Sequence, residues 1–339
     1  MGLIAPAYLR VHPSFEEPDI VMTYVQASMA FELLPNGQPR VKLSDGDLGV
    51  YLKRLDYRTK MAAGQAAYNS LPNVELIFSY GFTPSYLIRT RAEWDHHDEA
   101  AAGRWGIGLQ QGYRLAGQAG HFQFMRSALL YGINPAVGEG LVNSTSSTTV
   151  VGLPADTAGN TSISTYDNGQ MAQLLLTYIQ QLKTRTNQIG TGRKIAILAP
   201  QRVLGTWEYS VVQLVQYQRA GAGTETTAGM TKLVGEINED EVLWGPDDTL
   251  IGKGSGGTDM IIICMPELEV LNAERINTNR FADLKPGFRD CTAMYCDMIA
   301  PREIVTPLPG GAVDMLAEAR ITSGWPVRPE ALTIISATF

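Results

Sequence analysis

The spacing of apolar residues changes several times along this chain, and these changes predict where its elements lie. In residues 167–187, apolar side chains recur every three or four positions, which is the period of an amphipathic helix. Asp167 precedes this run and suits an N-cap. The predicted inward face consists of Met171, Leu174, Leu175, Tyr178 and Leu182.

Two short continuous apolar runs have the character of buried strands. They are KIAILAP (194–200) and DMIIICMP (259–266), and both are too short for a typical helix. With the helix before each of them, the order helix, strand, helix, strand predicts a small mixed α/β lobe over residues 160–270.

A second helix is predicted over residues 95–131, a stretch without proline. Its large apolar residues fall near helical spacing, and the YGINP segment places a glycine and then a proline just past the expected end. Each glycine in a helix interior costs about 1 kcal/mol relative to alanine. We therefore expect neighbouring elements to clasp this long helix closely. Its glycines are Gly103, Gly106, Gly108, Gly112, Gly117 and Gly120.

The first 90 residues have a different pattern. Residues 1–45 lack an amphipathic period and contain five prolines, which predicts an extended arm. Two strand-like pieces, GVYLKRLDYRT and VELIFSYGFTPSYLIRTR, flank the small, polar segment KMAAGQAAYNSLPN. That segment predicts a projecting loop. Residues 55–72 carry few large apolar side chains, so we expect them to serve contacts between subunits rather than folding. Near the end, CTAMYCDMIAPREIVTPLP and ALTIISATF predict strands that return to the first lobe.

Length, charge and cysteine content narrow the class of protein. At 339 residues the chain exceeds the usual size of one core, so two lobes are expected. A net charge of −7 argues against a nucleic-acid partner that is wrapped or read by sequence. Three cysteines favour a reducing compartment without a disulfide framework. No apolar run approaches the ~20 residues that span a bilayer, and the N-terminal segment lacks the pattern of a signal peptide.

His96 and His97, in EWDHHDEAAAGRWGIG, form the most histidine-dense stretch. Adjacent residues of a helix point about 100° apart, whereas helical zinc pairs need i, i+4 spacing, and no third ligand is evident. Asp95, Asp98 and Glu99 suit the positive end of a helix dipole. We therefore expect the first turn of a helix here, and no metal site.

The remaining candidate motifs also favour structural roles. GKGSGGTD (252–259) lacks the spacing of a phosphate-binding loop and precedes a strand, so a hairpin or loop tip is expected. Cys291 and Cys296 fit buried core thiols, and His121 fits a core or interface histidine. His12 lies in no motif, and no serine has the G-x-S-x-G context. These residues predict no catalytic, cofactor-binding or metal site.

A projecting loop, one long helix and then YGINPAVGEGLVN resemble the tailed-bacteriophage major capsid proteins of the Hong Kong 97-like fold. In a subgroup of that family, a long helix runs into a tyrosine–glycine pair and then a G-L-x-N segment. Here these positions are Tyr131, Gly132, Gly140, Leu141 and Asn143. The ending ARITSGWPVRPEALTII also looks like the closing strand of that subgroup.

The resemblance implies an α+β fold and a division into four parts. They are an N-terminal arm (residues 1–45), an extended loop (46–90), a peripheral domain (91–149 and 286–339) built on a spine helix (95–131), and an axial domain (150–285).

The resemblance also implies assembly rather than catalysis. Subunits would form pentamers and hexamers of an icosahedral head shell that encloses phage DNA, with no cofactor, no metal and no membrane. Portal, scaffolding and decoration proteins are the further partners, and the chain would be assembled in the host cytoplasm. The family prototype crosslinks its subunits through lysine and asparagine; Lys53 or Lys60 could serve here, although no motif identifies a partner. An encapsulin-like compartment and a two-lobed α/β enzyme remain the alternatives.

Overall fold

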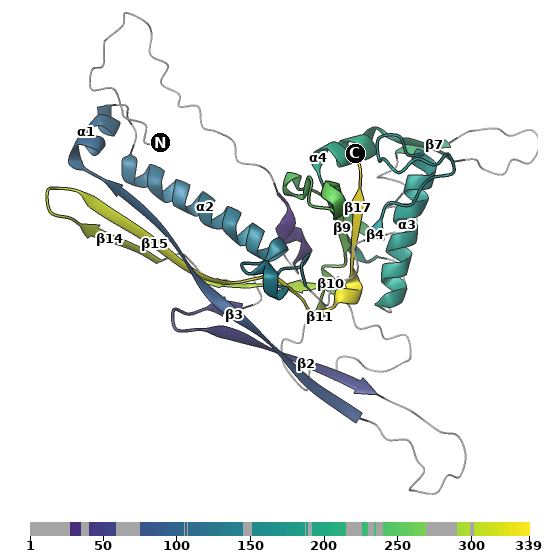
Figure 1. Cartoon of the computed structure of the whole chain (residues 1–339), viewed down its shortest axis with the longest axis horizontal. Coiled ribbons are helices and arrows are strands. Elements are labelled where there is room, and N and C mark those ends of the chain that lie inside the picture. The colour runs from purple at the N-terminus through teal and green to yellow at the C-terminus, as the bar shows by residue number, and fades with distance from the viewer. Residues whose placement is uncertain are drawn as a thin grey trace, which may run out of the picture.

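Two sheets organise the chain in its computed structural model (Figure 1). Together with the helices packed on them they give the α+β class that the sequence predicts. The structure describes residues 28–34, 41–58, 75–104, 106, 108–144, 151–186, 188, 192–214, 226–229, 234, 240–268, 290–298 and 302–339.

A six-stranded sheet forms the first lobe. Its order is β1-β13-β15-β3-β2, and β14 also pairs with β15. Its strands are β1 (Val41–Leu43), β2 (Gly49–Arg58), β3 (Glu75–Trp94), β13 (Cys296–Met298), β14 (Arg302–Pro307) and β15 (Val313–Thr322). Strand β1 comes from the predicted arm and lies parallel to β13, so this part of the arm is fixed within the subunit.

Strand β3 belongs to two structures at once. Its residues 85–94 pair with β15 inside the sheet, whereas residues 75–84 pair only with β2. The β2–β3 hairpin therefore projects beyond the sheet, as Figure 1 shows. The flanking strands of the projecting loop are thus where the sequence predicts them. Residues 59–74, with Lys60 and most of the stretch 55–72, lie outside the described residues.

The predicted spine helix is not continuous. It consists of α1 (His96–Arg104) and α2 (Leu109–Tyr131), so the prediction of one helix over 95–131 is wrong at the break between them. Gly106 has a φ of +71°, a left-handed conformation that a continuing α-helix cannot contain.

The close clasp expected around the glycines is also wrong within the subunit. A Cβ added to Gly103, Gly112 or Gly120 would meet nothing within 4 Å. The deepest packing of α2 is in its C-terminal turns, where Leu129 and Leu130 are fully buried, and His121 in the middle of the helix is also buried.

A five-stranded sheet forms the second lobe, in the order β4-β17-β9-β5-β8. These strands are β4 (Val151–Gly152), β5 (Lys194–Ala199), β8 (Glu241–Pro246), β9 (Asp259–Cys264) and β17 (Leu332–Ala337). The predicted strands at 194–200 and 259–266 are confirmed. Their continuous apolar character follows from burial on both faces, because alternate residues point to opposite sides of a strand.

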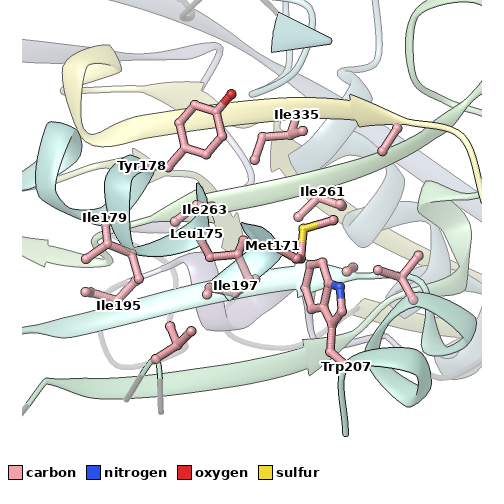
Figure 2. Packing of buried hydrophobic residues seen from close by; sticks show 14 of the residues in the cluster. Met171, Leu175, Tyr178, Ile179, Ile195, Ile197, Trp207, Ile261, Ile263 and Ile335 are labelled. Carbon is pink, nitrogen blue, oxygen red and sulfur yellow. The ribbon is translucent and has the colours of Figure 1, made fainter. Parts of the chain in front are cut away.

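Helix α3 (Asn168–Arg185) covers one face of this sheet together with α4 (Gln201–Tyr209). Figure 2 shows Leu175 and Ile179 of α3 with Ile195, Ile197 and Ile263 of the sheet in one cluster. The predicted helix is confirmed, and the Asp167 side chain accepts a hydrogen bond from the backbone N–H of Gln170 at 2.9 Å.

The opposite face of the sheet packs against the first lobe. Leu129 and Leu130 of α2 join Leu198 and Ile262 there, together with the short 3-10 helix η1 (Ala30–Leu33). This second cluster couples the two lobes.

The last strand lies in a different lobe from the one that the sequence predicts. We expected ALTIISATF to return to the first lobe, but β17 pairs with β9 along its whole length in the second lobe. Its alternating residues explain this position, because Ile334 packs in one cluster and Ile335 in the other. A strand with two apolar faces is stable only between two packed layers, and the second sheet offers both.

Short elements complete the structure. The paired strands are β6 (Val211–Leu214) with β7 (Thr226–Gly229), β10 (Glu267–Leu268) with β11 (Asp290–Cys291), and β12 (Ala293–Met294) with β16 (Trp325–Pro326). The short 3-10 helices are η4 (Pro135–Val137), η5 (Asp248–Leu250), η6 (Ser255–Gly257) and η7 (Pro329–Ala331). Across the described ranges, no helix combines the length and apolar character needed to cross a membrane.

Candidate assembly interface

The projecting hairpin has one strongly apolar face. Alternation along β3 places Leu76, Phe78, Tyr80 and Phe82 on the same side, and Tyr51 of β2 lies opposite Phe82 with ring centroids 4.9 Å apart. We call these five residues the aromatic stripe. These residues are 53–77% exposed, so the described part of the chain does not bury them.

The exposed area of the aromatic stripe is large. Aromatic side chains offer roughly 150–250 Å² each, so these exposures leave on the order of 500 Å² of aromatic surface in water. Tyr51, Lys53, Phe78, Ser79 and Tyr80 line a surface hollow of about 480 Å³ there. A contiguous apolar patch of this size commonly marks a contact with another molecule.

The motif YGINPAVGEGLVN (residues 131–143) lies where several backbone segments come very close to one another. We call these residues the junction. Gly132 and Gly140 have φ angles of +76° and +92°, and a Cβ on Gly140 would lie 2.3 Å from the backbone N of Gly132. A Cβ on Gly324, just after β15, would lie 2.2 Å from the carbonyl O of Leu129. The backbones meet so closely that only glycine fits.

Glu139 is the charged group at the centre of the junction. The Tyr86 hydroxyl of β3 donates to its Oε1 at 2.6 Å. The Ser323 hydroxyl donates to its Oε2 at 2.6 Å, and the backbone N–H of Asn134 donates to the same oxygen at 3.1 Å. One carboxylate thereby joins the hairpin strand, the loop after α2 and the end of β15. Burial, and the hydrogen bond to this carboxylate, raise the pKa of Tyr86 to about 12.

Tyr131 connects the junction to the second lobe. Its hydroxyl donates to the carbonyl of Thr249 at 3.1 Å, and burial raises its pKa to about 12. The Asn143 side-chain amide donates to the carbonyl of Tyr131 at 2.7 Å, and Leu141 is fully buried. The residues that carry the sequence resemblance therefore meet at one place.

Solved structures of capsids match this arrangement over nearly its whole length. The capsid of Myoviridae phage XM1 aligns with a TM-score of 0.66 and 10% identity, covering 96% of each chain. The capsid of the native GTA particle has a TM-score of 0.57, 10% identity, and covers 97% of this chain and 96% of its own. The mature capsid of bacteriophage PhiM1 has a TM-score of 0.55, 12% identity, and covers 96% and 92%.

The chain has the Hong Kong 97-like capsid fold. No protein-family model matches its sequence, and the search of curated proteins finds no match. The likeness is therefore one of fold, and the roles of individual residues rest on the geometry of this chain.

Within this capsid fold, the histidine pair lies at the start of α1. Asp95 caps that helix, because its Oδ1 accepts from the backbone N–H of His97 at 2.8 Å and of Asp98 at 2.9 Å. The predicted first turn is confirmed. The rings of His96 and His97 do not diverge as expected, since their centroids are 3.9 Å apart. No group of three potential metal ligands occurs among the residues that the structure describes.

The glycine-rich segment 252–259 forms a loop that leads into β9, as predicted. Its last residue, Asp259, is buried and accepts two hydrogen bonds from the guanidinium of Arg202, at 2.8 and 2.6 Å, and one from the Gly252 N–H at 3.2 Å. This loop is therefore fixed by a carboxylate rather than shaped to hold an anion.

The three cysteines and His121 lie in the core of the capsid fold. Cys264, Cys291 and Cys296 are all buried, which confirms the expectation for the last two. His121 is 3% exposed on α2 with its Nε2 3.5 Å from the Thr90 hydroxyl, and burial lowers its pKa. His12 lies outside the described residues.

Sequence reasoning did not single out Glu139 or the aromatic stripe. The alternation of Leu76, Phe78, Tyr80 and Phe82 was a signal for one apolar strand face. For Glu139 no comparable signal exists, because a glutamate between two glycines is typical of a solvated loop.

Proposed function

We propose that this chain is a phage major capsid protein that assembles into pentamers and hexamers of an icosahedral head shell. The capsid fold supports this proposal, and one observation carries it: the aromatic stripe on a hairpin that projects from the subunit. A stripe of this size in water favours association, and a projecting hairpin can deliver it to a neighbouring copy.

The contacts in such a shell are heterologous and repeated. Each subunit would present its hairpin to one neighbour and receive the hairpin of another, so modest contacts sum to a stable particle. The predicted arm, extended loop, peripheral domain and axial domain would have the roles that their names give them in this fold. Portal, scaffolding and decoration proteins are the further partners that we propose.

We propose that the shell encloses DNA without reading its sequence. The net charge of −7 suits a container better than a protein that wraps DNA. The proposed location is the virion head, with assembly in the host cytoplasm. The proposal needs no catalytic residue, cofactor or metal.

Two alternatives to the capsid function lead to different expectations. An encapsulin-like compartment would form shells that hold protein cargo instead of DNA. A two-lobed α/β enzyme would remain monomeric and bind a small ligand between its lobes.

The direct test is negative-stain microscopy and light scattering of the purified chain over a range of concentrations. Closed shells or rings of uniform size support the proposal. A chain that stays monomeric at high concentration, also together with the other proteins of its virion, contradicts it. Nuclease-protected DNA within particles isolated from infected cells separates a phage head from a compartment with protein cargo.

A further inference from the structure

The hairpin leaves the sheet at one defined place. Residues 85–94 of β3 pair with β15, whereas residues 75–84 pair only with β2, so the boundary lies between Pro84 and Ser85. The free part of β3 has ten residues, from Glu75 to Pro84. At about 3.3 Å per residue it extends roughly 30 Å, so a rotation of roughly 10° at Pro84 moves Glu75 by about 5 Å. Small changes at this root therefore move the outer part of the aromatic stripe by several Å.

One side of the hairpin root faces a hollow rather than packed side chains. A hollow of about 440 Å³ lies between residues 82–84 of the hairpin, 137–139 of the junction and 323–325 after β15. The Trp325 Nε1 is buried and has no hydrogen-bond partner among the described residues. Close packing holds the elements of a protein interior in a single arrangement. Because the hollow lacks such packing, another interaction has to fix the angle of the hairpin here.

Glu139 supplies that force, because it lies on the wall of this hollow and binds across it. Its Oε1 accepts from Tyr86, two residues beyond Pro84, at 2.6 Å. Its Oε2 accepts from Ser323 and from the backbone of Asn134. Hydrogen bonds to a charged acceptor are the stronger and more directional ones. Tyr86 pairs with Ile321 of β15, so the carboxylate ties the end of the sheet from which the hairpin leaves to both walls of the hollow.

Two further bonds join the junction to the segment after β15, from the backbone N–H of Ile133 to the Ser323 hydroxyl and from the N–H of Gly140 to the carbonyl of Gly324, both at 3.0 Å. Arg320 donates to the carbonyl of Asp47 and to the Ser85 hydroxyl, both at 3.1 Å. These bonds hold the two hairpin strands and β15 to one another. Among the described residues, the bond between Tyr86 and Glu139 is the side-chain hydrogen bond that holds this end of β3 against the junction.

We propose that Glu139 is a positioning residue that fixes the angle at which the β2–β3 hairpin leaves the subunit. Its consequence in the particle rests on the proposed shell function, because a fixed angle makes every hairpin meet its neighbour in the same way. Loss of the bond to Tyr86 then widens the range of hairpin angles and produces irregular particles, while the subunit stays folded.

The test uses spin labels on the unassembled subunit at low concentration. Ser79 on the hairpin and Gln180 on α3 are both exposed, so S79C and Q180C accept labels, whereas the three native cysteines are buried. The distance distribution between the labels is compared in Tyr86→Phe and Glu139→Ala. Ser79 lies about 17 Å from Pro84, so a freed swing of roughly 10° broadens the distribution by about 3 Å.

Tyr131→Phe is the matched control. It also removes one buried tyrosine hydroxyl at the junction, but its bond leads to Thr249 of the second lobe. We expect an unchanged distribution in this variant. Glu139→Gln retains an acceptor for Tyr86 and should restore most of the narrow distribution that Glu139→Ala loses.

The possible results separate this inference from the proposed function. Unchanged distributions in folded Tyr86→Phe and Glu139→Ala overturn the inference, even if wild-type shells form. A broadened distribution supports it, even if the wild type never assembles, in which case the shell function fails alone. If Glu139→Ala does not fold, Tyr86→Phe decides, because it leaves both bonds of Glu139 to the junction in place.

Discussion

Replacing Phe78 by serine should weaken association while leaving the subunit folded. Phe78 is 77% exposed, so about 150 Å² of its roughly 200 Å² is open to burial by a neighbouring copy. At about 25 cal/mol per Å², and with measured transfer values for phenylalanine, that burial contributes about 2–4 kcal/mol to each contact. Since 1.4 kcal/mol is a tenfold change in affinity, the concentration needed for assembly should rise by about 30-fold or more.

The assay is light scattering across a dilution series, with the critical concentration as its readout. Thermal unfolding of the unassembled subunit is measured in parallel and should change by at most about 1 kcal/mol, the size of one cross-strand pair. Ile77→Ser is the matched control, because Ile77 is the next residue of β3 and points to the opposite face. It removes a similar apolar group without touching the aromatic stripe.

Two outcomes would refute this reasoning. An unchanged critical concentration for Phe78→Ser means that the stripe is not buried on assembly. A loss of cooperative unfolding in Phe78→Ser means that the stripe stabilises the subunit itself.

Three further predictions concern the subunit. Gly324→Ala should destabilise it by about 3 kcal/mol in denaturant unfolding, because the new Cβ would lie 2.2 Å from the carbonyl of Leu129; normal stability would show that the backbones can separate. Gly120→Ala should stabilise the isolated subunit by about 1 kcal/mol, since its Cβ meets open space, and a simultaneous loss of shells would show that a neighbour approaches α2 there. Burial raises the pKa of Asp297 from 3.8 to about 6, so the protonated form favours the fold and the stability of the subunit should fall as pH rises through this window. Asp297→Asn should flatten that part of the stability profile and raise the thermal midpoint at pH 7. An unchanged profile would contradict the assignment.

The elements that the sequence predicted well are those whose pattern depends on local burial. Helix α3 combines a regular apolar period with a cap at Asp167, and β5 and β9 are apolar on both sides because both faces of their sheet are covered. The break in the spine helix was missed because the apolar spacing continues across it. The glycine density of residues 103–108 was the local signal, and the positive φ of Gly106 shows its effect.

The features that the sequence could not predict depend on contacts between distant segments. Strand β17 looks the same whether it joins the first sheet or the second, and only pairing with β9 decides between them. Glu139 acquires its role from Tyr86 and Ser323, which lie far from it in the chain. The alternation in β3 predicts an apolar face, but a sequence pattern does not distinguish burial by the same chain from burial by another copy.

The place of β17 in its sheet also determines when the subunit becomes ready during synthesis. It is the last of the five strands to be translated, yet it lies between β4 and β9 and contributes to the clusters on both faces. Chains generally fold by units as they emerge from the ribosome, but this lobe stays open until its last strand has emerged. A polypeptide that lacks residues 332–337 therefore cannot complete its second lobe. The order of the strands therefore makes closure of this lobe a late step of folding.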